Sequence, residues 1–150
     1  MSERERAVEL FKEGFNCSQS VFTAFAHRFN IDEKTAKKIS AGLGGGVGRL
    51  REVCGAVSGA AMVIGSLTAA TEGHDAEGKQ KNYELVQEFA RRFIDENGSV
   101  ICHELLGLDR ESEKSPKPDS RTAEYYKKRP CVELVECAAA ILEDMIKENE

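Results

Sequence analysis

Apolar residues recur along the chain with the 3.6-residue period of amphipathic helices, and the alternating pattern of a β-strand is nearly absent. Polar residues suited to begin helices, namely Asn16, Asp32 and Ser99, precede three of the periodic segments. Helices are predicted over residues 3–13, 16–29, 33–43, 53–70, 76–96, 99–107 and 130–147. The sequence thus predicts an all-α fold, a compact helical bundle of about five to seven helices.

Residues 109–129 interrupt this pattern with a long polar stretch that carries Pro116 and Pro118. A stretch of this length without periodicity is typical of a functional or surface loop. We interpret it either as a lid over a site or as a surface loop. Tyr125 and Tyr126 within it would then either cover that site or anchor the loop.

Two neighbouring segments are rich in glycine. In the predicted helix 53–70, Gly55 and Gly59 lie four residues apart and therefore on one face. Each glycine costs a helix interior about 1 kcal/mol, so we expect another backbone to approach this face closely. Before this helix, residues 42–48 read Gly-Leu-Gly-Gly-Gly-Val-Gly, but no strand precedes them and no lysine follows, which disfavours a phosphate-binding loop. The run is expected to bring the backbone close to Cys54 or to a ligand bound there. If that ligand is a cofactor, the residues expected to contact it are Gly45, Gly46, Gly48 and Gly55.

Length and charge limit the classes of protein that fit. The 150 residues suit one domain spanning 1–150, and 41% of them are hydrophobic. The net charge of −5 argues against a nucleic-acid-binding protein. The longest apolar run, residues 56–70, is interrupted by Ser, Thr and Gly, and the first residues open an amphipathic helix rather than a signal peptide. A soluble, cytoplasmic protein without a membrane span is therefore expected.

Four of the five cysteines fall in or near the first turn of four different predicted helices: Cys17, Cys54, Cys102 and Cys131. The free N–H groups and the positive dipole end of a helix start favour an anion, and a thiolate is such an anion. It is also the reactive form of cysteine and the form that binds metals. Basic residues lie just before two of these cysteines: Arg49, Arg51, Lys127, Lys128 and Arg129. We expect the four cysteines to converge in space.

Cys137 differs because it lies in the middle of the last predicted helix, at the edge of the apolar stripe. We interpret it as a bystander. Among the histidines, His27 and His74 are expected to be solvated, and His103 adjoins Cys102 but points about 100° away from it on a helix. For any single cysteine, packing in the core is an alternative to a chemical role.

Several segments occur in the order of a known family: Phe-Asn-Cys-Ser-Gln-Ser-Val at 15–21, Gly-Gly-Gly-Val-Gly at 44–48, Cys-Gly-Ala-Val-Ser-Gly at 54–59, Cys-His-Glu-Leu-Leu-Gly at 102–107 and Cys-x-x-Leu-Val at 131–135. The chain resembles the C_GCAxxG_C_C family over nearly its whole length. The resemblance implies a small helical protein thought of as redox-active and associated with transporter loci. It assigns the family cysteines to Cys17, Cys54, Cys102 and Cys131.

Three hypotheses about function remain open at this point. The four cysteines could cycle between dithiol and disulfide, or they could together ligate an iron–sulfur cluster or another thiolate-bound metal. In both cases a redox partner or a transport-associated protein is expected. In the third, the chain is a non-catalytic binding or adaptor module whose cysteines only pack. No Cys-x-x-Cys pair is present to decide among them.

Overall fold

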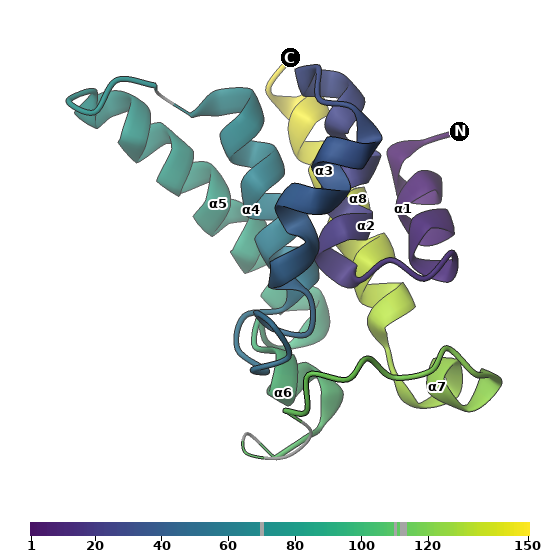
Figure 1. The fold of residues 1–150 in the computed structure, drawn as a ribbon. Helices are drawn as coiled ribbons and strands as arrows, with labels where there is room; N and C mark the ends of the chain where they lie inside the picture. The colour runs from purple at the N-terminus through teal and green to yellow at the C-terminus, as the bar shows by residue number, and fades with distance from the viewer. Residues whose placement is uncertain (70, 110, 112–113) are drawn as a thin grey trace.

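A computed structural model describes residues 1–69, 71–109, 111 and 114–150, and within these it contains helices but no strand. The predicted all-α bundle is confirmed (Figure 1). The α-helices of the described residues are α1 (Glu3–Lys12), α2 (Cys17–Ala24), α3 (Glu33–Ser40), α4 (Gly55–Thr68), α5 (Ala76–Asn97), α6 (Cys102–Leu106), α7 (Ala123–Lys128) and α8 (Cys131–Glu148). Short 3-10 helices follow α2 and α3, over Ala26–Phe29 and Ala41–Leu43.

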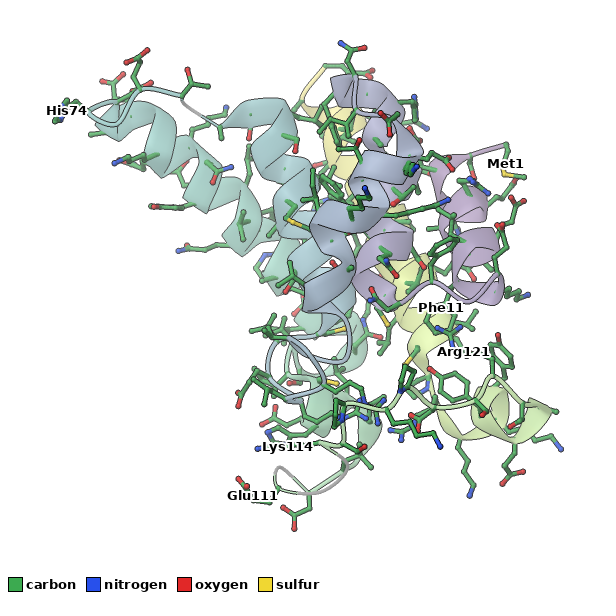
Figure 2. The ribbon with its side chains drawn as sticks, in the orientation of Figure 1. Met1, Phe11, His74, Glu111, Lys114 and Arg121 are labelled. Atoms are coloured by element: carbon green, nitrogen blue, oxygen red, sulfur yellow. The ribbon has the colours of Figure 1, made fainter. Side chains whose placement is uncertain are left out.

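Helix α2 lies at the centre of the bundle, where it contacts α1, α3, α4 and α8. Helix α5 packs on α4 and α8 and extends to the turn at His74, whereas α6 and α7 lie at the end of the bundle opposite both termini (Figures 1 and 2). Aromatic and aliphatic side chains fill the core, and the largest fully buried ones include Phe11, Phe25, Phe89, Phe93 and Leu142. Of the helices that the structure describes, none has both the length and the apolar character required to cross a bilayer.

The polar stretch 109–129 is less irregular than expected. Its last part forms α7, a six-residue helix whose start is capped by the Thr122 hydroxyl, which accepts the N–H of Tyr125. This helix was missed because it is short and lacks a buried face, and it raises the number of α-helices above the predicted range. Three positions of the predicted loop lie outside the described residues, namely 110, 112 and 113. The predicted helix end at residue 70 also lies outside them.

Two further expectations about helices are wrong. Ser99 does not begin α6, because Ile101, whose backbone is extended, is the N-cap instead. The backbone there pairs with the segment before α4 through an isolated bridge between Val53 and Ile101. Tyr83, predicted on the buried side of α5, is 61% exposed because the first half of this helix extends past the core.

The expected close contact at the glycine face of α4 is present. A Cβ atom built on Gly59 would lie 2.9 Å from the carbonyl oxygen of Ser18 and 3.3 Å from Cβ of Val21, both on α2. A Cβ on Gly55 would lie 3.1 Å from the backbone nitrogen of Ser18 and 3.2 Å from Cβ of Cys17. Glycine therefore sets the distance between α2 and α4, and with it the position of Cys17.

Replacing Gly59 with alanine is expected to destabilise the protein by about 1–3 kcal/mol, although alanine is the better helix former by about 1 kcal/mol. The added methyl group would meet the α2 backbone, which cannot rotate away as a side chain can. Gly65→Ala in the same helix is the matched control. Its Cβ would have only the Asn82 side chain nearby, at 4.0 Å, so this change should stabilise the protein. The free energy of unfolding of both variants is measured by urea unfolding followed by circular dichroism. Equal stability of the two variants would show that the α2 backbone does not restrict the residue at position 59.

Candidate functional site

The four cysteines at helix starts line one cavity of about 540 Å³ at the α6–α7 end of the bundle. The starts of α2, α4, α6 and α8 form its inner walls, and the glycine loop and residues 116–129 complete it. Cys137 is not among the lining residues, and its half-buried thiol instead donates a hydrogen bond to Oε2 of Glu96 at 3.0 Å. The structure thus brings Cys17, Cys54, Cys102 and Cys131 together, while their roles stay predictions.

Helix capping fixes the position of Cys17. Asn16 and Gln19 form a capping box: the Asn16 side chain accepts the backbone N–H of Gln19 at 2.9 Å, and the Gln19 side chain accepts that of Asn16 at 3.0 Å. Their amide groups also donate to the carbonyl oxygens of Ala41 and Lys37, at 2.9 and 3.0 Å. The start of α2 is therefore held both within the helix and against the end of α3. This explains why polar residues flank Cys17 in the motif.

The side chains of Cys17 and Cys131 act on each other, although the two residues are far apart in sequence. Hydrogen bonding with the Cys17 thiol lowers the pKa of Cys131 to about 7, and the Tyr125 hydroxyl and the charges of Arg129 and Arg121 act in the same direction, against burial. The same interaction, followed by burial, raises the pKa of Cys17 well above its ordinary value. Cys131 is therefore the thiol of the pair that ionises first, and near pH 7 about half of it is thiolate while Cys17 stays protonated.

Cys54 and Cys102 have different surroundings from this pair. Burial raises the pKa of Cys54 to about 12, although the backbone amides of Ala56 and Val57 act in the opposite direction. Burial also raises the pKa of Cys102, against the effect of Arg51, whose Nη1 donates to Cys102 Sγ at 3.8 Å. Both cysteines are thus protonated at neutral pH, and core packing describes Cys54 well.

Backbone pairing holds the starts of α4 and α6 together. The N–H of Cys54 donates to the carbonyl oxygen of Val100 at 2.8 Å, and the N–H of Cys102 donates to that of Glu52 at 2.6 Å. These bonds flank the bridge between the two segments, so the two cysteines are placed by one short ladder. This pairing could not be predicted from the sequence, because neither segment alternates like a strand.

The glycine loop winds in a left-handed conformation beneath the cavity. Gly45, Gly46 and Gly48 have φ values of +66°, +74° and +56°, and Arg49 and Arg51 adopt the same region at +66° and +63°. Left-handed backbone is unfavourable for non-glycine residues, and such strain concentrates at functional sites. Here it directs the Arg49 and Arg51 side chains into the cavity lining.

Close packing explains Gly44 and Gly46 of this loop without a cofactor. A Cβ atom on Gly46 would lie 2.6 Å from the nitrogen of Glu52 and 2.7 Å from Cβ of Cys102, and one on Gly44 would overlap the Asn16 side chain. A close backbone approach was predicted at Cys54, whereas the close contacts of Gly44 and Gly46 lie at Cys102 and at the start of α2. The four glycines that were expected to contact a cofactor all line the cavity: Gly45, Gly46, Gly48 and Gly55. Their role as cofactor contacts stays a prediction.

Residues 115–121 run across the cavity and are fastened at both ends by arginine. The Arg49 guanidinium donates to the carbonyl oxygen of Ser115 at 2.6 Å and pairs with Asp119 at 3.3 Å. Arg121 donates to the carbonyl oxygens of Phe11 and Phe15, at 2.6 and 2.9 Å, and stacks on the Phe11 ring (Figure 2). This geometry favours the interpretation of the stretch as a lid that covers a site, rather than as a plain surface loop.

Some residues of this lining were predicted from the sequence, and others were not. The cavity is lined by three of the basic residues named above, Arg49, Arg51 and Arg129, and by Tyr125. The other two, Lys127 and Lys128, are exposed and lie outside the lining. Arg121 and Asp119 were missed because they lie in a polar stretch where charged residues are ordinarily solvated. Their proximity to two prolines that also line the cavity was the only available signal. The lining contains no histidine.

The arrangement of donor atoms bears on the metal hypothesis. Among the described residues, no three His, Cys, Asp or Glu side chains are grouped so that they could hold a metal ion. The four cysteines as placed therefore do not fit a three- or four-thiolate centre, which needs converging sulfurs around one metal or cluster. The cluster and metal assignments of these residues gain no support from the structure and stay predictions.

The fold and the cavity define a class: small all-helical proteins in which cysteines from four helix starts surround one cavity. The chain belongs to the C_GCAxxG_C_C family, whose model matches residues 15–145 and is described as "Putative redox-active protein (C_GCAxxG_C_C)". The family resemblance expected from the motifs is thereby confirmed. No curated protein and no solved structure matches the chain significantly.

Proposed function

We propose that the chain is a thiol–disulfide redox protein in which Cys131 is the attacking thiolate and Cys17 the resolving thiol. The observation that carries this proposal is that Cys17 and Cys131 line one cavity, where the interaction between their side chains lowers the pKa of Cys131 to about 7. A thiol whose pKa lies near the ambient pH combines a large thiolate fraction with high nucleophilicity. Membership of a family described as redox-active supports the same chemistry.

The reaction exchanges two electrons with a disulfide co-substrate. The Cys131 thiolate attacks one sulfur of the co-substrate, the S–S bond breaks, and the first product leaves as a thiolate while a mixed disulfide forms. Cys17 passes its proton to the departing thiolate and then attacks Sγ of Cys131. The mixed disulfide breaks, the second product leaves as a thiolate, and the Cys17–Cys131 disulfide remains. The protein is oxidised, and the co-substrate is reduced to one thiol and one thiolate, which takes a proton from water.

Mapping the disulfide tests this proposal. Reduced protein is treated with neutral 2-hydroxyethyl disulfide, quenched with acid, alkylated and digested for mass spectrometry. We expect the Cys17–Cys131 linkage to form first, because these two side chains act on each other in one cavity and Cys131 has a lowered pKa, whereas burial raises the pKa of Cys54 and Cys102. A Cys137→Ser variant should form the same linkage at the same rate. A first linkage that joins Cys54 to Cys102, or no intramolecular linkage, would contradict the proposal.

A further inference from the structure

We propose that residues 115–121 form a size-selective lid, which admits low-molecular-weight disulfides to Cys131 and excludes disulfides carried on folded proteins. This inference rests on the proposed function and names the class of co-substrate. Its first support is the burial of the thiols. Cys131 is only 9% exposed, and Cys54 and Cys102 are buried more deeply. A disulfide therefore reaches Cys131 by entering the cavity and not by touching the protein surface.

The lid is a single layer of chain between the cavity and solvent. It runs between α6 and α7 (Figure 1), and four of its residues line the cavity: Pro116, Pro118, Asp119 and Arg121. Residues 115–120 are at the same time exposed. The two prolines fix their own φ angles, so the segment has less freedom to fold away than an ordinary loop.

Asp119 ties the middle of the lid to two walls of the cavity. Its Oδ2 lies 3.3 Å from Nη1 of Arg49, on the glycine loop, and 3.7 Å from Nη2 of Arg129, just before α8. The two arginine side chains are only 17% and 13% exposed, so these ion pairs are partly shielded from water. Arg49 also donates from Nε to the carbonyl oxygen of Ser115 at 2.6 Å. One carboxylate thus joins the glycine loop, the lid and the start of α8.

Arg121 fastens the other end of the lid to the end of α1. Its guanidinium donates to the carbonyl oxygens of Phe11 and Phe15, at 2.6 and 2.9 Å, and lies 4.0 Å from the centre of the Phe11 ring (Figure 2). Carbonyl oxygens in the last turn of a helix lack partners within the helix and attract positive charge. A protein disulfide would have to break these contacts, or those of Asp119, before it could reach Cys131.

The cavity beneath the lid has room for a small molecule. Its volume of about 540 Å³ lies within the range of about 300–1,000 Å³ that is usual for small-molecule sites, and it is partly open to solvent. A small disulfide therefore enters while the lid is in place, whereas a folded protein depends on the rare molecules in which the lid has opened. The exchange is the one given above, in which two electrons pass from Cys17 and Cys131 to the disulfide.

Two pairs of reagents that share a reactive group and differ in size test the lid. Methyl 2-pyridyl disulfide is compared with ubiquitin that carries one 2-pyridyl disulfide, and N-ethylmaleimide with ubiquitin that carries one maleimide. A Cys137→Ser background is used throughout, so that all remaining thiols line the cavity. Each rate is divided by the rate of the same reagent with 2-mercaptoethanol. We expect the corrected rate of the small reagent to exceed that of the large one by a factor on the order of 100.

Releasing the lid should reduce this ratio. Asp119→Ala removes the carboxylate that joins the lid to two walls and is expected to lower the ratio about tenfold, since hydrogen bonds between charged groups then no longer oppose opening. Arg121→Ala frees the other end and should lower the ratio as well. Both reagents of a pair meet the same thiolate, so a change in its ionised fraction cancels from the ratio. Asp95→Ala is the matched control, because Asp95 pairs with Arg91 on the surface of α5, outside the cavity, and it should leave the ratio unchanged.

The maleimide pair separates this inference from the proposed function, because alkylation needs no disulfide chemistry. Corrected rates that do not depend on size would overturn the inference even if 2-hydroxyethyl disulfide produces the Cys17–Cys131 linkage. A ratio that stays unchanged in both Asp119→Ala and Arg121→Ala would also overturn it, since the lid would then not be what excludes the large reagent. Size dependence with the maleimides that is relieved in Asp119→Ala, without formation of the Cys17–Cys131 linkage, would support the lid and overturn the proposed redox pair.

Discussion

Substitution of Cys131 by serine is expected to abolish the fast alkylation of this protein at pH 7. A thiol with a pKa of about 7 is half ionised at this pH, whereas an ordinary cysteine is only about 1–3% ionised. Since alkylation by iodoacetamide proceeds through the thiolate, the fastest thiol should react roughly 20- to 50-fold faster than an ordinary one. The variant should retain only slow phases, because burial keeps Cys54 and Cys102 protonated.

The pH dependence of this reaction identifies the group. The alkylation rate of Cys131 should rise with pH and reach half its maximum near pH 7, as the thiolate forms. Tyr125→Phe removes one hydrogen bond to the thiolate and should move this midpoint upward by about one pH unit, since a hydrogen bond to a charged group contributes about 1.5 kcal/mol. Cys17→Ala removes the larger contribution and should move it further.

The matched control is Cys137→Ser. The pKa of Cys137 is raised to about 11, first by burial and then by Glu96, so this thiol contributes nothing to the fast phase at pH 7. Its removal should leave both the rate and the midpoint unchanged. A fast phase that persists in Cys131→Ser, or one that disappears in Cys137→Ser, would show that the reactive thiol has been assigned to the wrong residue.

Gly46→Ala is expected to have the largest effect on stability among the glycine substitutions, about 3 kcal/mol or more. Two costs combine: a left-handed φ costs a non-glycine residue about 1–2 kcal/mol, and an overpacked site costs about 1–3 kcal/mol. The methyl group would meet backbone atoms of Arg51 and Glu52 at 2.8 and 2.6 Å, as well as Cβ of Cys102. None of these backbone atoms can move without disturbing the ladder that places Cys54 and Cys102.

Gly107→Ala isolates the two costs from each other. Gly107 has a φ of +67°, close to the +74° of Gly46, but a Cβ there would have no atom within 4 Å. Its substitution should therefore cost only the conformational part, about 1 kcal/mol. Chemical denaturation measures both variants. In Gly46→Ala we also expect faster alkylation of Cys102 under native conditions. Equal destabilisation in the two variants would mean that the packing around Gly46 relaxes freely.

The sequence predicted the fold because the main helices bury apolar stripes, which periodicity reports directly. It failed in two places. Tyr83 was assigned to the buried side of α5 with Phe89 and Phe93, but around the helix it lies about 120° and 80° away from them, and it is exposed. Helix α7 was missed because its six residues contain no buried side chain.

The candidate site was predicted in part for a comparable reason. Helix starts are encoded locally, so the positions of the four cysteines could be inferred from capping residues and helical phase. The pairing of Cys17 with Cys131 depends on how α2 packs against α8, which is a tertiary contact without a local signal. The left-handed conformation of Arg49 and Arg51 was also hidden, because local preference assigns that conformation to glycine.

The placement of the cavity has a practical consequence for handling the protein. Both chain ends shown in Figure 1 lie at the end of the bundle opposite α6 and α7, whose residues help to line the cavity. A molecule anchored to a resin or an electrode through either end would thus direct its cysteines toward the flowing solution. The proposed disulfide exchange can then be followed on a surface, where successive disulfides are supplied and washed away over the same immobilised sample.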